Sequence, residues 1–288
     1  MKKTIKALAS FALVLGLAGC SASGTAASTK GSASAEDKTI KVGATAVPHA
    51  EILNDVVKPA LEKEGWTLDV VEFNDYVQPN TALNDGDLDA NYFQTVRYLD
   101  EQIKERSLKL TAVAGIHLEP MGLYSSKYKS LDEIPDGSRI AIPNDGSNES
   151  RALKLLEDNG LITLDHSKDL YVPGDVTENK KNLQFDEVDA ATLPRTLDDD
   201  AASVINGNYA LQANLNPKTD ALCAEAADGP DAHYYINYLV VQEGNEDTEK
   251  TKALVKALQS DDVKKYIEDK YQGSVIPAFT DGDGNVLK

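Results

Sequence analysis

The chain has few cysteines, few basic residues and no long apolar run after its first twenty residues. Only two of its 288 residues are cysteines, so we expect a fold that depends on its hydrophobic core without an intramolecular disulfide. It has 29 Lys and Arg against 47 Asp and Glu, a net charge of -18. This acidity argues against a nucleic-acid partner, because phosphates require a basic face. After residue 20 no segment approaches the roughly 20 apolar residues that span a membrane.

Motifs typical of enzymes and metal sites are also missing. The sequence has no Gly-x-Ser-x-Gly elbow, no phosphate-binding loop and no Glu-x-x-His pairing. Cys223 lies ten residues before His233, but a lone Cys beside Leu and Ala is more often a small buried hydrophobe than a nucleophile. Four histidines are scattered along the chain: His49, His117, His166 and His233. We therefore expect a protein without enzymatic activity, without a metal site and without a cofactor.

The first 37 residues have the pattern of an export signal and a tether. Three lysines precede an apolar stretch over residues 7–18, whose helix would rise only about 18 Å, too short for a membrane span. The segment ends in Leu-Ala-Gly-Cys20, which resembles the lipobox of bacterial lipoproteins, where a diacylglycerol is attached to the cysteine. We therefore predict a signal peptide over 1–19, then lipidated Cys20 and a flexible Ser- and Ala-rich tether over 20–37.

The rest of the chain alternates short apolar runs with amphipathic helices, which predicts an α/β fold. Pro59 is expected to kink or shorten its helix. The predicted strands cover residues 39–45, 68–73, 89–93, 139–143, 185–192, 201–205 and 234–242. The predicted helices cover residues 52–61, 81–84, 94–106, 147–159, 248–258 and 261–271.

Two long extended stretches, near 113–124 and 234–242, separate an early unit from a middle unit. This layout predicts two lobes joined by two crossing strands, with a cleft between them that a hinge can close. We assign residues 38–116 with 238–288 to lobe 1 and residues 117–237 to lobe 2.

Five segments in register resemble the NlpA lipoprotein family, the methionine-binding proteins of ABC importers. The matching segments are Phe73-Asn74-Asp75-Tyr76-Val77-Gln78-Pro79-Asn80, Asp89-Ala90-Asn91-Tyr92-Phe93-Gln94, Ile142-Pro143-Asn144-Asp145 with Asn148 and Arg151, Leu193-Pro194-Arg195, and Val204-Ile205-Asn206. The resemblance runs from about residue 40 to the C-terminus. It implies a two-lobed, type II periplasmic-binding-protein fold without enzymatic activity.

Arg151 is the candidate partner for a ligand carboxylate. We expect it on the first turn of a helix capped by Ser147 or Asn148, where the free N–H groups already favour an anion. A guanidinium there can add a bidentate clamp, and the resemblance puts the carboxylate arginine at this position. The alternative is a surface arginine that pairs with Glu149 or Asp158.

Two asparagines could hold both charges of a free amino acid, because an amide both donates and accepts hydrogen bonds. Asn206 ends an apolar strand and Asn237 interrupts another; they could equally be a turn former and a satisfied core amide. The resemblance favours ligand roles for both. Glu119 could serve an ammonium group or stiffen a hinge, and its role stays open.

Aromatic residues are the candidates for the ligand side chain. Tyr76, Phe93 and Tyr98 could line an apolar pocket, with Thr95 on the same helix face as Tyr98, and a thioether packs well against such rings. Strand alternation allows only one of Tyr92 and Phe93 to face the cleft. Family members carry a histidine where this chain has Thr95, which predicts a wider pocket or another solute. Ordinary core packing of Phe93 and Tyr98 is the alternative.

The sequence thus predicts a lipid-anchored solute-binding protein at the extracytoplasmic face of the cell membrane. The expected partners are methionine, L or D, and the permease and ATPase subunits of an ABC importer. The alternatives are a receptor for a methionyl dipeptide or another amino acid, and a surface interaction lipoprotein that has no ligand.

Overall fold

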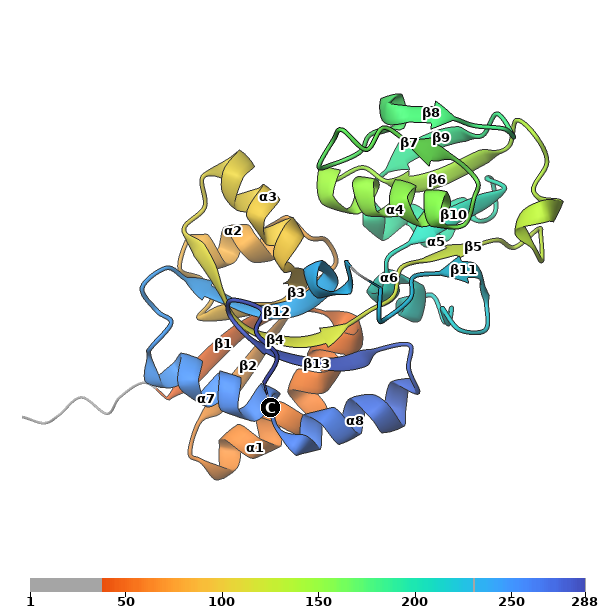
Figure 1. Ribbon diagram of the computed structural model, residues 1–288. Helices are drawn as coiled ribbons and strands as arrows, with labels where there is room; N and C mark the ends of the chain where they lie inside the picture. Colours follow the sequence, from red (N-terminus) through yellow and green to blue (C-terminus); the bar gives the residue numbers. More distant parts are fainter. Residues whose placement is uncertain (1–37, 230, 288) are drawn as a thin grey trace, which may run out of the picture. The chain divides into compact units, whose positions relative to one another are not determined.

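Two β-sheets organise the described part of the chain, residues 38–229 and 231–287 of a computed structural model (Figure 1). The predicted signal peptide, Cys20 and the tether lie outside the described residues. Among the described residues, no helix combines the length and apolar character that a membrane span requires. The α/β prediction is confirmed, and each sheet with its helices is called a lobe below.

The first lobe contains a six-stranded mixed sheet. Its strands, in spatial order, are β13 (Ile276–Asp281), β4 (Leu110–Leu118), β12 (Ile236–Gln242), β3 (Ala90–Thr95), β1 (Thr39–Thr45) and β2 (Thr67–Phe73). β1 pairs in parallel with β2 and β3, whereas β12 runs antiparallel to β3 and β4. All six residues of β3 are buried because helices cover both faces of the sheet.

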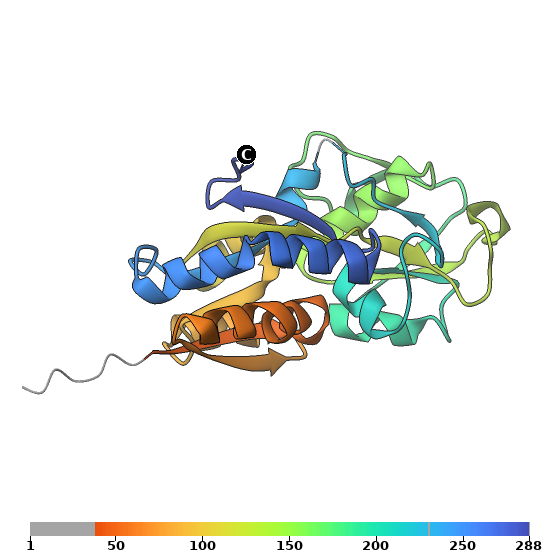
Figure 2. The same ribbon diagram turned by 90° about the horizontal axis from the view of Figure 1, so that it is seen from below.

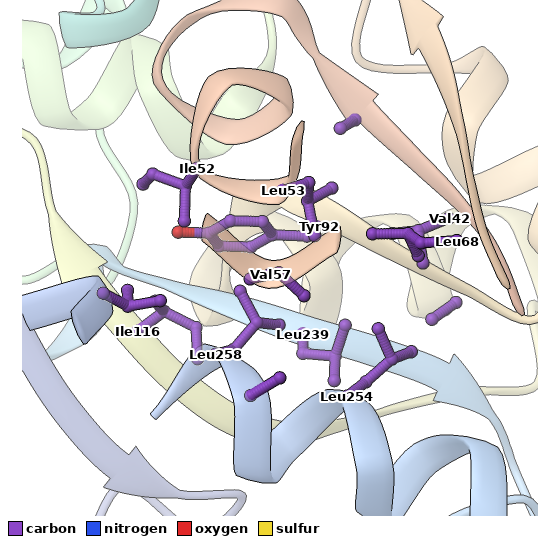
Figure 3. Packing of buried hydrophobic residues seen from close by; sticks show 14 of the residues in the cluster. Val42, Ile52, Leu53, Val57, Leu68, Tyr92, Ile116, Leu239, Leu254 and Leu258 are labelled. Carbon is purple, nitrogen blue, oxygen red and sulfur yellow. The ribbon is translucent and has the colours of Figure 1, made fainter. Parts of the chain in front are cut away.

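The helices of this lobe divide between the two faces of the sheet. They are α1 (Lys58–Lys63), α2 (Gln78–Asn84), α3 (Val96–Arg106), α7 (Glu249–Leu258) and α8 (Asp261–Tyr271). One face packs against α1, α7 and α8, which lie together in Figure 2, and the other packs against α2 and α3. Figure 3 shows the first core, in which the Tyr92 ring lies among Ile52, Leu53 and Val57.

The second lobe contains a five-stranded sheet and a separate hairpin. The sheet strands, in spatial order, are β11 (Ala221–Ala224), β5 (Gly122–Tyr124), β10 (Ala202–Ile205), β6 (Arg139–Pro143) and β9 (Gln184–Val188). The hairpin pairs β7 (Thr163–Leu164) with β8 (Val176–Glu178). Helix α4 (Gly146–Asp158) covers one face, and α5 (Leu193–Thr196) and α6 (Gly207–Gln212) contribute to the core on the other.

Three boundaries differ from prediction for local reasons. The helix continues through Pro59, because a π-helical turn over Leu53–Val57 precedes α1 and changes the hydrogen-bond register there. The strand expected over 185–192 ends at Val188, where the Asp189 carboxylate accepts from Ala191 N–H (2.9 Å) and starts a 3₁₀ turn. The second crossing lies before β12, which belongs entirely to the first sheet, and includes a 3₁₀ turn over Ala232–Tyr235.

Candidate functional site

A pocket between the two lobes collects all eight residues that the sequence nominated for ligand binding. The space along its walls is about 350 Å³, part of which is open to solvent. The lining residues are Tyr76, Phe93, Gln94, Thr95, Tyr98, Glu119, Asn148, Arg151, Asn206, Gly207, Asn208 and Asn237. Gln94, Gly207 and Asn208 were missed, because a polar residue at a strand end or a helix start resembles an ordinary turn residue in the sequence.

Aromatic rings form one wall of the pocket. The Tyr76 ring lies 5.9 Å from that of Phe93, 5.7 Å from that of Tyr98 and 5.0 Å from that of Tyr209, measured between centroids. Tyr98 O–H donates to the Tyr76 carbonyl (3.1 Å). Phe93 lines the pocket whereas Tyr92 lies in the core, as strand alternation predicts. Phe93 and Tyr98 both line the pocket and are both nearly inaccessible to solvent.

Thr95 is a helix cap and does not lie on a helix face. The predicted helix from Gln94 begins two residues later, at Val96, because β3 continues through Thr95. The Thr95 hydroxyl accepts from Tyr98 N–H at 3.3 Å and so caps α3. This bond ties the end of the strand to the first turn that carries Tyr98.

Arg151 lies at the pocket, but its surroundings differ from prediction. The α4 N-cap is Asp145, so Arg151 is in the second helical turn and neither Ser147 nor Asn148 is the cap. Its partner is Glu225, not Glu149 or Asp158: Nε donates to Oε1 at 2.7 Å and Nη2 to Oε2 at 2.6 Å. Because Nη2 also donates to the Glu119 carbonyl (2.9 Å), the expected bidentate clamp is not available to a ligand.

One edge of the Arg151 guanidinium is left for a ligand. The centroid of the Tyr235 ring lies 4.0 Å from the guanidinium carbon, Cζ, of Arg151. Among the described residues, no hydrogen bond from Nη1 is present. The two N–H groups of Arg151 Nη1 can therefore donate to an anion without loss of the Glu225 pair.

Three asparagines hold the opposite wall of the pocket. Asp145 accepts from the Asn148 backbone N–H (3.0 Å) and side chain (2.8 Å), and Asn148 in turn accepts from Asn206 Nδ2 (2.8 Å). In the described part of the chain, Asn206 Oδ1 and Asn208 Nδ2 are buried without a hydrogen-bond partner. A buried unpaired amide atom is costly, so a free acceptor and a free donor in one pocket indicate a ligand with both functions.

His49 and His117, distant in the sequence, lie together beside Glu119, which lines the pocket. His117 Nε2 lies 2.7 Å from Glu119 Oε1, and His49 Nε2 lies 3.4 Å from the same oxygen. His49 also lies 3.1 Å from Asn237 Oδ1. Burial lowers the pKa of His49 to about 4 and that of His117 to about 3, and burial raises the pKa of Glu119. Both imidazoles are therefore neutral at pH 7.

These three side chains are ligand types that zinc accepts, and they lie close enough to hold an ion. However, ligands on a tetrahedral zinc with bonds of about 2.0–2.1 Å lie about 3.3 Å apart. The 2.7 Å separation of His117 and Glu119 is that of an N–H donor bonded directly to a carboxylate. The arrangement fits a hydrogen-bonded carboxylate better than a metal site.

The remaining candidate, Cys223, is partly buried against the core. It lies on β11 and packs against the apolar core of the second lobe. Burial raises the pKa of its thiol to about 11, which keeps it protonated at neutral pH and unreactive as a nucleophile.

Comparison with known proteins agrees with this architecture. The family model described as NlpA lipoprotein matches residues 40–279. The chain belongs to the NlpA lipoprotein family. The family resemblance drawn from the five motifs is thereby confirmed, and so is the two-lobed fold, because solved members superimpose on this chain.

Three relatives illustrate the match. The methionine-binding lipoprotein MetQ of Bacillus subtilis is 41% identical, covering 92% of this chain and 96% of its own. The membrane lipoprotein TpN32 of Treponema pallidum is 40% identical, covering 85% of this chain and 90% of its own. A nutrient-binding protein from Burkholderia cenocepacia, solved with bound methionine, is 46% identical with a TM-score of 0.78, covering 83% of this chain and 99% of its own.

Proposed function

We propose that this protein is the lipid-anchored solute-binding protein of an ABC importer and captures methionine, L or D, in the pocket between its lobes. The observation that carries the proposal is the pair of unpartnered amide atoms, Asn206 Oδ1 and Asn208 Nδ2, beside the aromatic wall. The names of the relatives agree with it, since they include methionine-binding lipoproteins.

The polar side of the pocket suits the zwitterionic end of an amino acid. Arg151 Nη1 and Asn208 Nδ2 are donors for a carboxylate, and Asn206 Oδ1 is an acceptor for an ammonium group. Asn148 accepts a hydrogen bond from Asn206 and so positions it. His49 contacts both Asn237 and the Glu119 carboxylate, so it links these two side chains. A solute without a carboxylate and an ammonium group would leave several buried polar atoms unpaired, which is costly.

The opposite side suits an unbranched thioether. Tyr76, Phe93 and Tyr98 present ring faces and edges, against which a methionine sulfur is stabilised by about 0.3–1.5 kcal/mol per contact. Thr95, smaller than the histidine of the family pattern, lines the pocket at the α3 cap. These four residues would therefore select for the side chain of the solute.

The remaining parts of the proposal concern the chain outside the pocket. Lipidated Cys20, following a signal peptide over 1–19, would anchor the protein at the extracytoplasmic face of the cell membrane, with 20–37 as tether. The lobes assigned from the sequence, residues 38–116 with 238–288 and residues 117–237, would move relative to one another, although these bounds cut two residues from the end of β4 and two from the start of β12. The protein would deliver the solute to the permease and ATPase subunits. We assign the protein a binding role without catalysis, cofactor, metal or nucleic acid.

Identification of the solute tests the proposal directly. Mass spectrometry of the purified protein should find methionine, and calorimetry after solute removal should give heat with L- or D-methionine. Heat only with methionyl dipeptides would move the assignment to a peptide receptor. No heat with any of them from a folded protein would favour a surface interaction lipoprotein and overturn the proposal.

Arg151 offers a sharper test of the pocket itself. Arg151→Ala should weaken methionine binding by about 2–5 kcal/mol, since it removes a buried cation and leaves Glu225 unpaired. Arg139→Ala is the matched control, because that side chain is half exposed in the same lobe and pairs with Asp186 and Asp200 away from the pocket. A loss below about 0.5 kcal/mol for Arg151→Ala would show that it does not hold the ligand.

A further inference from the structure

Glu119 is the charged group of the pocket that lacks an oppositely charged partner. The only other charged side chain among the lining residues is Arg151, whose charge Glu225 already neutralises. Glu119 is 5 % exposed, and a buried carboxylate is costly unless hydrogen bonds or a cation stabilise it. The pocket without solute therefore carries an excess negative charge at Glu119.

A chain of hydrogen bonds fixes the Glu119 carboxylate from behind. His117 can donate its Nε2–H to Oε1 only if its Nδ1 accepts from Tyr92 O–H, and these two atoms are in hydrogen-bond contact. His49 likewise directs Nε2–H toward Asn237 and Glu119 while its Nδ1 accepts from Thr45 O–H (2.7 Å). Both imidazoles thus act as neutral donors whose tautomers are set by a second partner.

The front of the same carboxylate faces the pocket. The Asn208 backbone N–H donates to it, and Gly207 lies so close that an added Cβ would lie 2.6 Å from Glu119 Cβ. The absence of a side chain at Gly207 is therefore what lets α6 approach this carboxylate. The free acceptor of Asn206 lines the same pocket.

We infer that Glu119 is a specificity-determining residue that restricts the pocket to solutes carrying an ammonium group, with His49 and His117 as its positioning residues. The inference rests on the proposed function and deepens it, because it names the charge that the solute must bring. An amino acid supplies one cation for Glu119 and one carboxylate for Arg151 Nη1 and Asn208. A carboxylic acid without the amino group supplies only a second anion.

Binding should then be linked to the ionisation of Glu119. The titratable and charged groups around Glu119 are His49, His117, Tyr76, Tyr92 and Arg151. Of these, His117 lies on β4, the strand that Glu119 directly follows. Burial raises the pKa of Glu119 in the empty pocket, while the two histidines stay neutral and Arg151 stays charged across the same range. A bound ammonium group lowers the pKa of Glu119. The affinity for the solute therefore falls as the pH drops through the pKa that Glu119 has in the empty pocket.

Calorimetry with matched ligands tests this assignment. We compare methionine with 4-(methylthio)butanoate, its analogue without the amino group, on the wild type and on Glu119→Gln. The wild type should bind methionine at least about 30-fold more tightly than the analogue. In Glu119→Gln this ratio should shrink toward one, mainly through weaker methionine binding. Glu62→Gln, an exposed carboxylate on α1, should leave the ratio unchanged.

The pH profile separates a charge effect from a structural one. On acidification the wild type should release protons when it binds methionine, seen as a dependence of heat on the ionisation enthalpy of the buffer, and Glu119→Gln should not. His117→Leu should move the midpoint to higher pH, and His117→Gln, which keeps an N–H donor, should restore it. This inference is wrong, while the proposed function stands, under the following result: the wild type binds methionine without proton release, and Glu119→Gln keeps the wild-type ratio of methionine to analogue affinity. If the wild type binds no amino acid, the proposed function fails first.

Discussion

At the scale of single residues, the buried charges of the pocket are explained by their partners. Arg151 and Glu225 lie 74 positions apart, and the side chain of Arg151 is 5 % exposed against 17 % for Glu225. A guanidinium so deeply buried requires a counterion, and a carboxylate in bidentate contact supplies it with the geometry that Arg prefers. The pairing also fixes which edge of the guanidinium remains for a solute.

Glu225→Gln should destabilise the fold although it hardly changes the volume of the side chain. Loss of the charge leaves the Arg151 cation buried without a counterion, which should cost about 2–4 kcal/mol of unfolding free energy, toward the lower end because Glu225 is partly exposed. Urea denaturation measures this difference. The control is Asp269→Asn in the exposed Lys265–Asp269 pair, where we expect about 0.5 kcal/mol or less. Equal losses in both variants would contradict a buried ion pair.

At the scale of one element, helix α4 concentrates acidic groups near its N-terminus. Glu149 lies in the first turn, where the helix dipole favours an anion. Nevertheless its pKa is raised to about 7, by burial first and then by Glu187, Asp145 and Glu101. Repulsion among the carboxylates and loss of hydration therefore outweigh the helix dipole at this turn.

This shift predicts how stability depends on pH. Between about 4.5 and 7 the folded protein holds the Glu149 proton more tightly than the unfolded chain does, so this group lowers stability as pH rises through that range. Glu149→Gln should therefore raise the unfolding free energy at pH 8 by about 1 kcal/mol, a figure that allows for partial screening by solvent. Below pH 4.5 the substitution should leave the unfolding free energy unchanged. Urea denaturation at both pH values measures it. Glu268→Gln, exposed on α8, should change neither; a destabilised Glu149→Gln at pH 8 would show that the charge is favourable.

At the scale of the whole molecule, direct contacts close the lobes over the pocket. Tyr76 O–H donates to Asn208 Oδ1 (2.5 Å), and Tyr209 O–H donates to the Asn74 carbonyl (3.2 Å). On α3, Glu101 accepts from the Ser147 backbone N–H at the start of α4 (3.0 Å). Glu101 does not line the pocket, so its contribution to binding acts only through closure.

Glu101→Ala should therefore weaken solute binding without touching the solute. Loss of a carboxylate from the N-terminus of α4 should cost the closed form about 1–2 kcal/mol, or roughly 5- to 30-fold in affinity, mainly as faster dissociation. Stopped-flow fluorescence measures the rates, and small-angle scattering should show a larger open fraction. Glu105→Ala, exposed on the next turn of α3, is the control. Unchanged dissociation in Glu101→Ala would mean that this contact does not hold the lobes closed.

The sequence by itself determined most elements of this fold, because apolar periodicity and helix or strand punctuation are local properties. The candidate ligand residues rested also on the resemblance to the NlpA family. The sequence predicts β1 at its observed bounds, and its candidates Arg151, Asn206 and Phe93 all line one pocket. Strand β13 was missed, since its pairing with β4 depends on a distant partner.

Only the tertiary structure decided how the polar groups pair. Arg151 meets Glu225, and His49 meets His117 and Glu119, across 68 or more residues of chain. Thr95 became a cap because β3 continues two residues further, where pairing with β12 holds it. A buried polar atom takes whichever partner packing brings within hydrogen-bond distance, and local sequence carries no record of which segments will pack together.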